Sequence, residues 1–156
     1  TRMIDALFGI GDTKSGKAQP KERMASRITF EEHTIDGGQF GMVQSRVSID
    51  RFTGGALDTA LFNQQPHIGG TVKLKCRIKN PEDHEIGLLL LVLKDLWTGD
   101  LALGGEASVG RGRLLGKSAV IHHNGAAWRI QSAENGTLSI TGDRERLEAF
   151  VKAVKA

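Results

Sequence analysis

A strict alternation of apolar and basic residues between Val72 and Lys79 constrains the fold more than any other feature of the sequence. The order is Val-Lys-Leu-Lys-Cys-Arg-Ile-Lys. Successive side chains of a β-strand point to opposite faces, so this segment is predicted to be a strand with one apolar and one cationic face. The cationic face holds Lys73, Lys75, Arg77 and Lys79. It fits either a solvated outer face or a ladder of charges facing phosphate.

The segment after this strand predicts a helix. Asn80 is expected to cap the helix, with Pro81 at the first helical position. Apolar residues recur at helical spacing from Ile86 to Trp97, and further leucines widen the apolar face. We therefore expect a well-buried helix that ends near Gly99.

Glycine is concentrated directly after this helix. Of the 20 glycines in 156 residues, six fall between Gly99 and Gly116. Glycine lets backbone amides approach a polyanion closely, and Arg111 and Arg113 would supply forked donors for phosphate oxygens. A tight turn without a ligand is the alternative. A dinucleotide site would need the order strand, glycines, helix, whereas here the order is helix, glycines, strand.

The other segments mix strands and helices, which predicts an α+β fold. A strand is expected at 26–31, a hairpin-like excursion with few apolar residues at 44–65, and a strand at 113–121. A short hairpin should follow at 128–130 and 137–140. Asp143 or a neighbour should cap a final helix, whose apolar stripe holds Leu147, Phe150, Val151 and Val154. Residues 9–23 are expected to form a solvated loop, and Cys76 is expected to pack in the core.

Composition excludes several classes of protein. The net charge of +3 and the sequence pI near 9.2 permit a polyanionic partner without proving one. A single cysteine excludes an internal disulfide framework and fits a reducing cytoplasm. No stretch reaches the roughly 18 apolar residues that cross a bilayer, and no secretory signal is visible, so no membrane association is expected.

No catalytic residue can be assigned from the sequence. The five histidines form no metal-ligand pattern, and they are His33, His67, His84, His122 and His123. The adjacent pair His122-His123 should point to opposite faces of a strand. Asp36, Asp50 and Asp58 occur singly, and neither Asp36 nor Asp58 has a second carboxylate at a spacing that would form a metal pair. We expect neither a metal nor a cofactor.

Three segments match the motifs of one family in the family's own order. They are Leu7-Phe8-Gly9, the stretch Arg46-Val47-Ser48-Ile49-Asp50-Arg51-Phe52-Thr53-Gly54-Gly55-Ala56 followed by Ala60-Leu61-Phe62, and the glycine-rich Leu103–Arg113. Together they resemble the RAMP superfamily, the repeat-associated proteins of CRISPR effector complexes. The second segment resembles the thumb of the backbone subunits of type III complexes, a hairpin that reaches over the guide–target duplex.

The resemblance implies a ferredoxin-like (RRM-like) domain with a thumb-like hairpin insertion, lacking its first strand and helix. One RAMP-like domain would fill 1–156, with a core of about 7–121 and an appended hairpin and helix of about 122–156 that match no family element. The chain would then be a fragment of a longer protein, or a partner segment would complete its sheet. The RNA-cleaving aspartate of the family would lie upstream, so this chain alone is expected not to cut RNA.

The implied function is binding of the guide-RNA sugar–phosphate backbone within a type III antiviral ribonucleoprotein. Expected partners are guide RNA, target RNA and other effector subunits, either repeated copies or related RAMP subunits. The candidate RNA-binding residues are Gly104, Gly105, Ser108, Gly110, Arg111, Gly112, Arg113, Arg46, Arg51, Thr53, Lys73, Lys75 and Arg77.

Two other functions stay open. One is a RAMP-fold endoribonuclease that processes CRISPR RNA with a histidine as general base. Those enzymes share the glycine loop but not the Ile-Asp-Arg-Phe-Thr-Gly segment, which favours the RNA-binding subunit. The other is a protein-assembly domain, in which the glycines form turns and the lysines keep the surface soluble.

Overall fold

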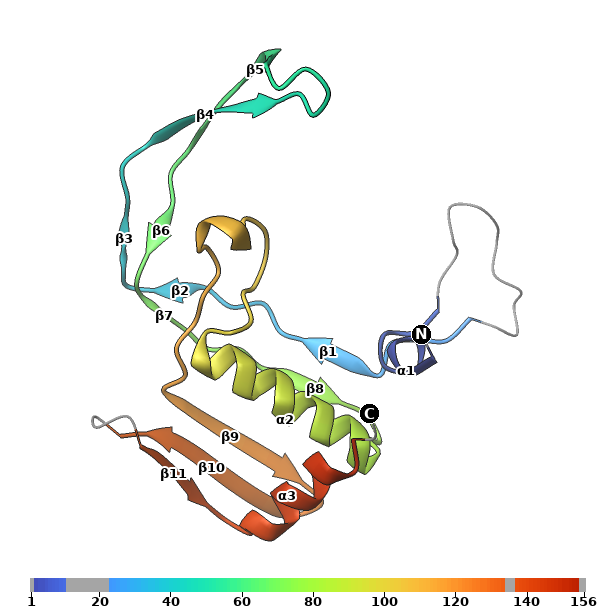
Figure 1. Ribbon diagram of the computed structural model, residues 1–156. Coiled ribbons are helices and arrows are strands. Elements are labelled where there is room, and N and C mark those ends of the chain that lie inside the picture. The colour runs from blue at the N-terminus through green and yellow to red at the C-terminus, as the bar shows by residue number, and fades with distance from the viewer. Residues whose placement is uncertain (1, 11–22, 134–136, 155–156) are drawn as a thin grey trace. The chain divides into compact units, whose positions relative to one another are not determined.

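The computed structural model describes residues 2–10, 23–133 and 137–154. Within these ranges the chain is mixed α+β, as the sequence predicts, and it has three helices, the first of them not predicted, and small antiparallel sheets. It divides into two compact units, residues 1–79 and 80–156, and each is described by itself (Figure 1). Most of the loop predicted for 9–23 lies outside the described residues.

The first unit begins with a helix and a two-stranded antiparallel sheet. Helix α1 (Arg2–Phe8) precedes strand β1 (Ile28–Phe30), which pairs with β8 (Cys76–Ile78). Among the described residues of this unit, the buried apolar side chains are Leu7 and Ile28. The Leu7 carbonyl accepts the Arg27 backbone N–H at 2.9 Å and thereby ties the end of α1 to the start of β1. The strand predicted at 26–31 is confirmed in a shorter form.

The predicted continuous strand at 72–79 is wrong, because the segment changes partners. Thr71–Val72 (β7) pairs with Ile35–Asp36 (β2), whereas β8 pairs with β1, and residues 73–75 lie between them without strand structure. The expected apolar face is covered only at its two ends, where Val72 and Ile78 are half-buried. Leu74 is 54% exposed. Cys76 is also exposed, so its assignment to the core is wrong.

A long two-stranded arm extends from this region, as Figure 1 shows. Beyond β2 and β7, Gln39–Phe40 (β3) pairs with His67–Ile68 (β6), and Gln44–Ile49 (β4) pairs with Ala56–Gln64 (β5). The hairpin predicted at 44–65 is therefore confirmed and continues further toward both ends. The β4/β5 register shifts between Val47 and Ile49, and Thr59 on β5 has a positive φ of 62°.

The second unit packs two helices on one face of a three-stranded sheet (Figure 1). The sheet has the order β11 (Leu138–Thr141), β10 (Ala126–Ser132), β9 (Ser118–His123). Helix α2 (Asp83–Thr98) and helix α3 (Arg144–Lys152) cover it. The core consists of Ile86, Trp128, Leu147 and Phe150. This sheet confirms the predicted C-terminal hairpin, and α3 confirms the predicted final helix.

The ends of these elements follow the predictions in part. Gly99 ends α2 with a φ of 77°, and the Asp143 carboxylate caps α3 by accepting the Arg146 backbone N–H at 3.0 Å. The predicted cap at Asn80 is wrong. Asn80 has a φ of 44°, and Glu82 is the N-cap residue. The strand predicted at 113–121 starts only at Ser118, and Arg113 forms an isolated bridge with Ala102 instead.

Helix α2 is less buried than its apolar sequence predicts. Ile86 and Gly87 near its start are buried against α3 and the sheet, whereas Leu89, Leu93 and Trp97 are half-buried. Gly87 allows the contact with α3, because a Cβ there would lie 2.0 Å from the Phe150 carbonyl oxygen. Helix α3 has only nine residues, so it covers the first turns of α2 rather than its whole length.

Candidate nucleic-acid interface

The glycine-rich segment forms a loop that is closed at its base. The Leu103 backbone N–H donates to the Gly112 carbonyl at 2.9 Å, next to the bridge between Ala102 and Arg113. A Cβ on Gly112 would lie 2.0 Å from the Leu103 carbonyl oxygen, and its φ is 74°. Position 112 therefore requires glycine on two independent grounds. Between the closing residues, Ala107–Val109 forms a short 3-10 helix.

The loop brings together seven of the residues that the sequence singled out. Its outer part is exposed at Gly104, Gly105, Ser108 and Gly110. Gly104 and Gly110 have positive φ values, and no atom would contact a Cβ at Gly104, Gly105 or Gly110. This bare backbone permits the close approach of a ligand that the sequence analysis predicts, although open glycines also occur in simple turns.

Both arginines of the loop are held by protein groups. Arg111 Nη1 donates to Glu106 Oε2 in a partly buried ion pair. Arg113 Nη1 donates to the Gly99 carbonyl oxygen at 2.6 Å and so fixes the loop to the end of α2. A guanidinium carries five N–H donors, so this single bond orients Arg113 and leaves its fork able to bind phosphate. The arginines thus shape the loop, a role that the sequence analysis did not predict.

A second basic segment lies in the first unit, at β8 and the residues just before it. Lys73, Lys75, Arg77 and Lys79 are all exposed. Glu31 faces two of them, with its carboxylate 2.9 Å from Lys75 Nζ and 3.8 Å from Arg77 Nη2. The hydrogen bond from Lys75 holds the pKa of Glu31 below its usual value. Among the described residues, one carboxylate therefore offsets a segment of four cations, which we call the basic strip (residues 73–79).

The remaining candidates lie on the arm. The guanidinium of Arg46 donates to Gln44 Oε1 at 3.1 Å, and Arg51 lies exposed in the turn between β4 and β5. Asp50 shapes this turn, because its Oδ1 accepts the backbone N–H groups of Phe52 and Thr53 at 2.7 and 2.8 Å. These two bonds lower the pKa of Asp50. The loop residues belong to the second unit, whereas the arm and the basic strip belong to the first.

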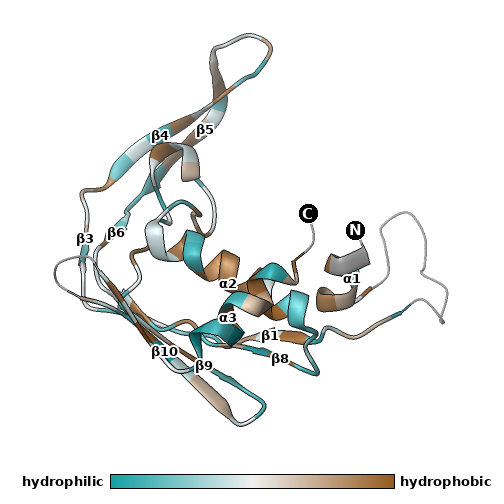
Figure 2. Cartoon of the chain, turned by 60° about the horizontal axis from the view of Figure 1, so that its bottom comes forward, coloured by the Kyte–Doolittle hydropathy of each residue, from teal (hydrophilic) through white to brown (hydrophobic). Residues whose placement is uncertain are grey.

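Exposed apolar side chains on the arm are a feature that the sequence analysis missed. Phe52 at the tip is 94% exposed, and Ile49 and Leu61 are 60% and 73% exposed. Figure 2 shows hydrophobic segments on both β4 and β5. A two-stranded ribbon has no second layer to cover these side chains. The alternation of apolar and polar residues from Arg46 to Ile49 places Val47 and Ile49 on one face of the ribbon, and this could have indicated an apolar face without a cover.

Charge is divided unevenly between the two units. Residues 1–79 contain 12 basic and 8 acidic residues, whereas residues 80–156 contain 9 basic and 10 acidic residues. The basic excess of the chain therefore belongs to the first unit, which carries the basic strip and the arm. A polyanion is attracted to a region of net positive charge, so this unit is the better candidate for contacts with phosphates.

The histidines of the β9–β10 region lie as predicted. His123 packs edge-on against Phe150 at 5.8 Å between ring centroids, while its neighbour His122 is exposed. His84 Nδ1 lies 3.4 Å from Glu82 Oε2. Within the described residues, no group of three or more histidine, cysteine, aspartate or glutamate side chains could hold a metal ion. No helix among the described residues is long and apolar enough to span a membrane.

Comparison with known proteins gives the family. The family model of the RAMP superfamily matches residues 1–114, which include the arm, the basic strip and the glycine-rich loop. No curated protein matches the chain. The family match ends before β9, so the sheet of the second unit and α3 lie outside it. Because the match covers well over half of the sequence, the chain belongs to the RAMP superfamily.

Proposed function

We propose that this chain is a CRISPR-associated RNA-binding subunit that contacts the sugar–phosphate backbone of a guide RNA. The observation that carries the proposal is the basic strip, four exposed cations with one opposing carboxylate, in the unit that holds the basic excess of the chain. Membership of the RAMP superfamily agrees with this function. Lysine and arginine side chains attract phosphates without reading base sequence, as a guide-binding subunit requires.

The finer features of the proposal rest on the resemblance of the motifs. We propose a ferredoxin-like domain without its first strand and helix, in which 44–65 is the thumb and about 122–156 is an appended hairpin and helix. The partners would be guide RNA, target RNA and related subunits of a type III effector in the cytoplasm. The exposed arm and the bare glycine loop support this arrangement because both present backbone and side chains to a large ligand.

The first experiment measures binding of the full chain to a fluorescent single-stranded RNA over a range of salt concentrations. Lys73→Gln combined with Lys79→Gln should weaken binding and reduce the salt slope by about 0.7 for each lost phosphate contact. These two side chains have no ion pair with a described residue, so their loss should leave the fold intact. Lys94→Gln removes one charge from the second unit and serves as the control.

The second experiment tests the glycine loop. Arg113→Lys keeps the positive charge but removes the forked guanidinium donor. If this guanidinium binds phosphate, the variant should bind RNA more weakly. The same change can loosen the loop, because Arg113 also binds the Gly99 carbonyl. Thermal unfolding of the variant separates the two effects. If RNA affinity and salt slope are unchanged in both the strip and the loop variants, the chain is better explained as a protein-assembly domain than as an RNA-binding subunit.

An endoribonuclease is the second candidate, and one contact favours it. His84 lies beside Glu82, and a carboxylate can orient an imidazole as a general base. We nevertheless propose that the chain binds RNA without cutting it. Labelled single-stranded and guide-paired RNA should stay intact with the chain across pH 5–9, with or without magnesium. Cleavage that disappears in His84→Ala would instead identify the chain as the nuclease.

A further inference from the structure

An apolar groove lies in the second unit, between α3 and the sheet. Its volume is about 340 Å³. Aliphatic side chains form its walls, and these are Leu90, Ile130, Ile140, Leu147 and Val151. All of them except Leu90 lie beyond residue 114, where the match to the RAMP superfamily ends. The groove therefore belongs to the part of the chain that the family resemblance does not explain.

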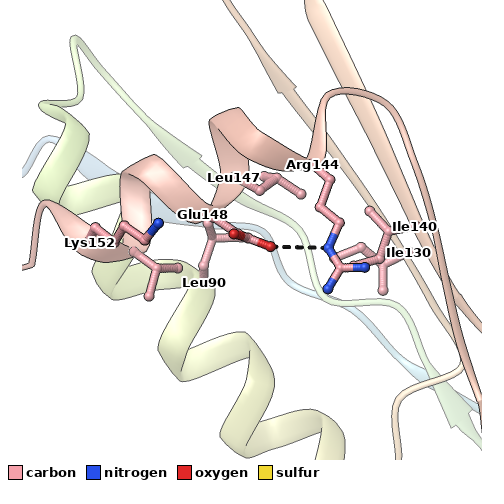
Figure 3. A pocket seen from close by; sticks show the side chains of 8 residues that line it. Leu90, Ile130, Ile140, Arg144, Leu147, Glu148 and Lys152 are labelled. Atoms are coloured by element: carbon pink, nitrogen blue, oxygen red, sulfur yellow. Dashed lines mark hydrogen bonds and ion pairs between the residues drawn. The ribbon is translucent and has the colours of Figure 1, made fainter.

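The rim of the groove is charged. Figure 3 shows Arg144 extending from α3 toward Ile130 and Ile140, with Glu148 facing its guanidinium. Arg144 Nε lies 3.1 Å from Glu148 Oε1, so this pair largely neutralises itself. Lys152 also lines the groove, and its side chain has no hydrogen bond or ion pair to a described residue. The rim therefore offers one positive charge beside an aliphatic floor.

This chemistry favours a protein segment over RNA. A nucleobase is usually held by stacking on an aromatic ring or an arginine plane. The described residues that line the groove include no aromatic side chain, and the guanidinium of Arg144 is already bound by Glu148.

We propose that the groove docks an acidic, aliphatic segment of a partner protein. A leucine or isoleucine of the partner would fill the space between Ile140, Leu147 and Val151. A neighbouring carboxylate of the same segment would pair with Lys152. Burial of aliphatic surface supplies affinity for such a segment, and the positive charge of Lys152 at the rim favours a segment with negative charge.

The test is a methyl NMR titration of the full 156-residue chain. One probe is a short peptide that alternates leucine with glutamate, and the matched probe replaces every glutamate by lysine. The acidic peptide should shift the methyl signals of Ile130, Ile140 and Val151 and should bind at least about fivefold more tightly than the basic one. Val120 lies on the opposite face of the same sheet, so the control variant Val120→Asp should not change this binding.

Lys152→Glu provides the sharpest variant because it changes an exposed side chain at the end of α3. It should reverse the preference, so that the basic peptide becomes the tighter ligand. Equal binding of the two peptides, or none, would overturn the proposal. Stronger shifts of the same methyl signals by a poly-uridine RNA would assign the groove to nucleic acid instead, and concentration-dependent shifts without any probe would assign it to a second copy of the chain.

Discussion

Single glycines decide how closely backbone segments of the second unit approach each other. At Gly87 the Phe150 carbonyl occupies the place of a side chain, and at Gly116 the ring of Trp97 does so, 1.9 Å from where a Cβ would lie. Packed interiors adjust little to an added methyl group, so these positions tolerate no larger residue without movement of the backbone or the ring. The close contact of α2 with α3 therefore depends on residue 87.

Gly87→Ala should lower the free energy of unfolding by about 2–3 kcal/mol, because α2 and α3 must move apart. Helix propensity alone would favour alanine by about 1 kcal/mol, so the sign of the change separates the two effects. Urea unfolding followed by circular dichroism measures it. Gly105→Ala is the control, since its Cβ would meet open space and its stability should change by less than about 0.5 kcal/mol. Stabilisation by Gly87→Ala would contradict the close helix contact.

Asp50 gives the turn of the arm a dependence on pH. Its pKa is lowered in the folded turn by the backbone N–H groups of Thr53 and Phe52. A lowered folded pKa means that the carboxylate stabilises the turn above the ordinary value of about 3.9, and that this stabilisation is lost as the pH falls through the lower folded value.

NMR should therefore show that the Asp50 side chain titrates below pH about 3.9. The amide signals of Phe52 and Thr53 should move at the same pH, because their hydrogen bonds weaken as Oδ1 is protonated. Titration of Asp50 above its ordinary value would refute the proposed turn geometry.

At the scale of elements, the start of α2 shows how a local exchange of hydrogen bonds sets a helix boundary. The backbone N–H of Glu82 donates to Glu85 Oε2 at 2.8 Å, and the Glu82 side chain accepts from the backbone of Glu85. This capping box satisfies two backbone donors that the first turn of a helix otherwise leaves without partners. It begins α2 two residues after the proline, although Asn80 and Pro81 also have the character of helix starters.

Glu85→Ala should lower the free energy of unfolding by about 1–2 kcal/mol, because it removes half of the capping box at a buried position. Asp83→Ala, which changes an exposed residue in the same turn, should cost less than about 0.5 kcal/mol. Chemical unfolding of both variants provides the measurement. Equal losses would mean that the charge of the first turn matters and the capping box does not.

At the scale of the whole molecule, the two units differ in how much core they contain. The second unit buries Ile86, Trp128, Leu147 and Phe150 together, and the Trp128 indole N–H donates to the Asp143 carbonyl at 2.7 Å. The arm of the first unit is a two-stranded ribbon whose apolar side chains remain exposed. A ribbon of this kind is marginally stable without a partner surface.

Hydrogen exchange should therefore separate the units in the absence of RNA. Amides of α2 near Leu90 and of β10 near Trp128 should exchange slowly, while those of β4 and β5 should exchange at least about a hundredfold faster despite their ladder of hydrogen bonds. Mass spectrometry of peptic fragments measures both in one sample. Equal protection of the arm and of β10 would show that the ribbon needs no partner surface for its stability.

The sequence by itself determined several of the elements and where two of them begin or end. Period-two alternation and helical spacing depend only on the geometry of a single segment, so the hairpin at 44–65, the C-terminal hairpin and the final helix are all predictable. Local chemistry likewise places Asp143 at the start of α3 and Gly99 at the end of α2. The glycine-rich loop and the arm motif also carry the family resemblance that the match over residues 1–114 confirms.

Only the tertiary structure decided what each segment contacts. The alternation from Val72 to Lys79 cannot reveal that the chain passes from β2 to β1 as its partner, because period two describes side-chain direction and not the neighbouring strand. For the same reason it cannot show that Cys76 stays exposed. The partners of Arg111 and Arg113, Glu106 and the Gly99 carbonyl, depend on how the loop closes. Burial and pairing are properties of two surfaces in contact, whereas a pattern within one segment describes only one of them.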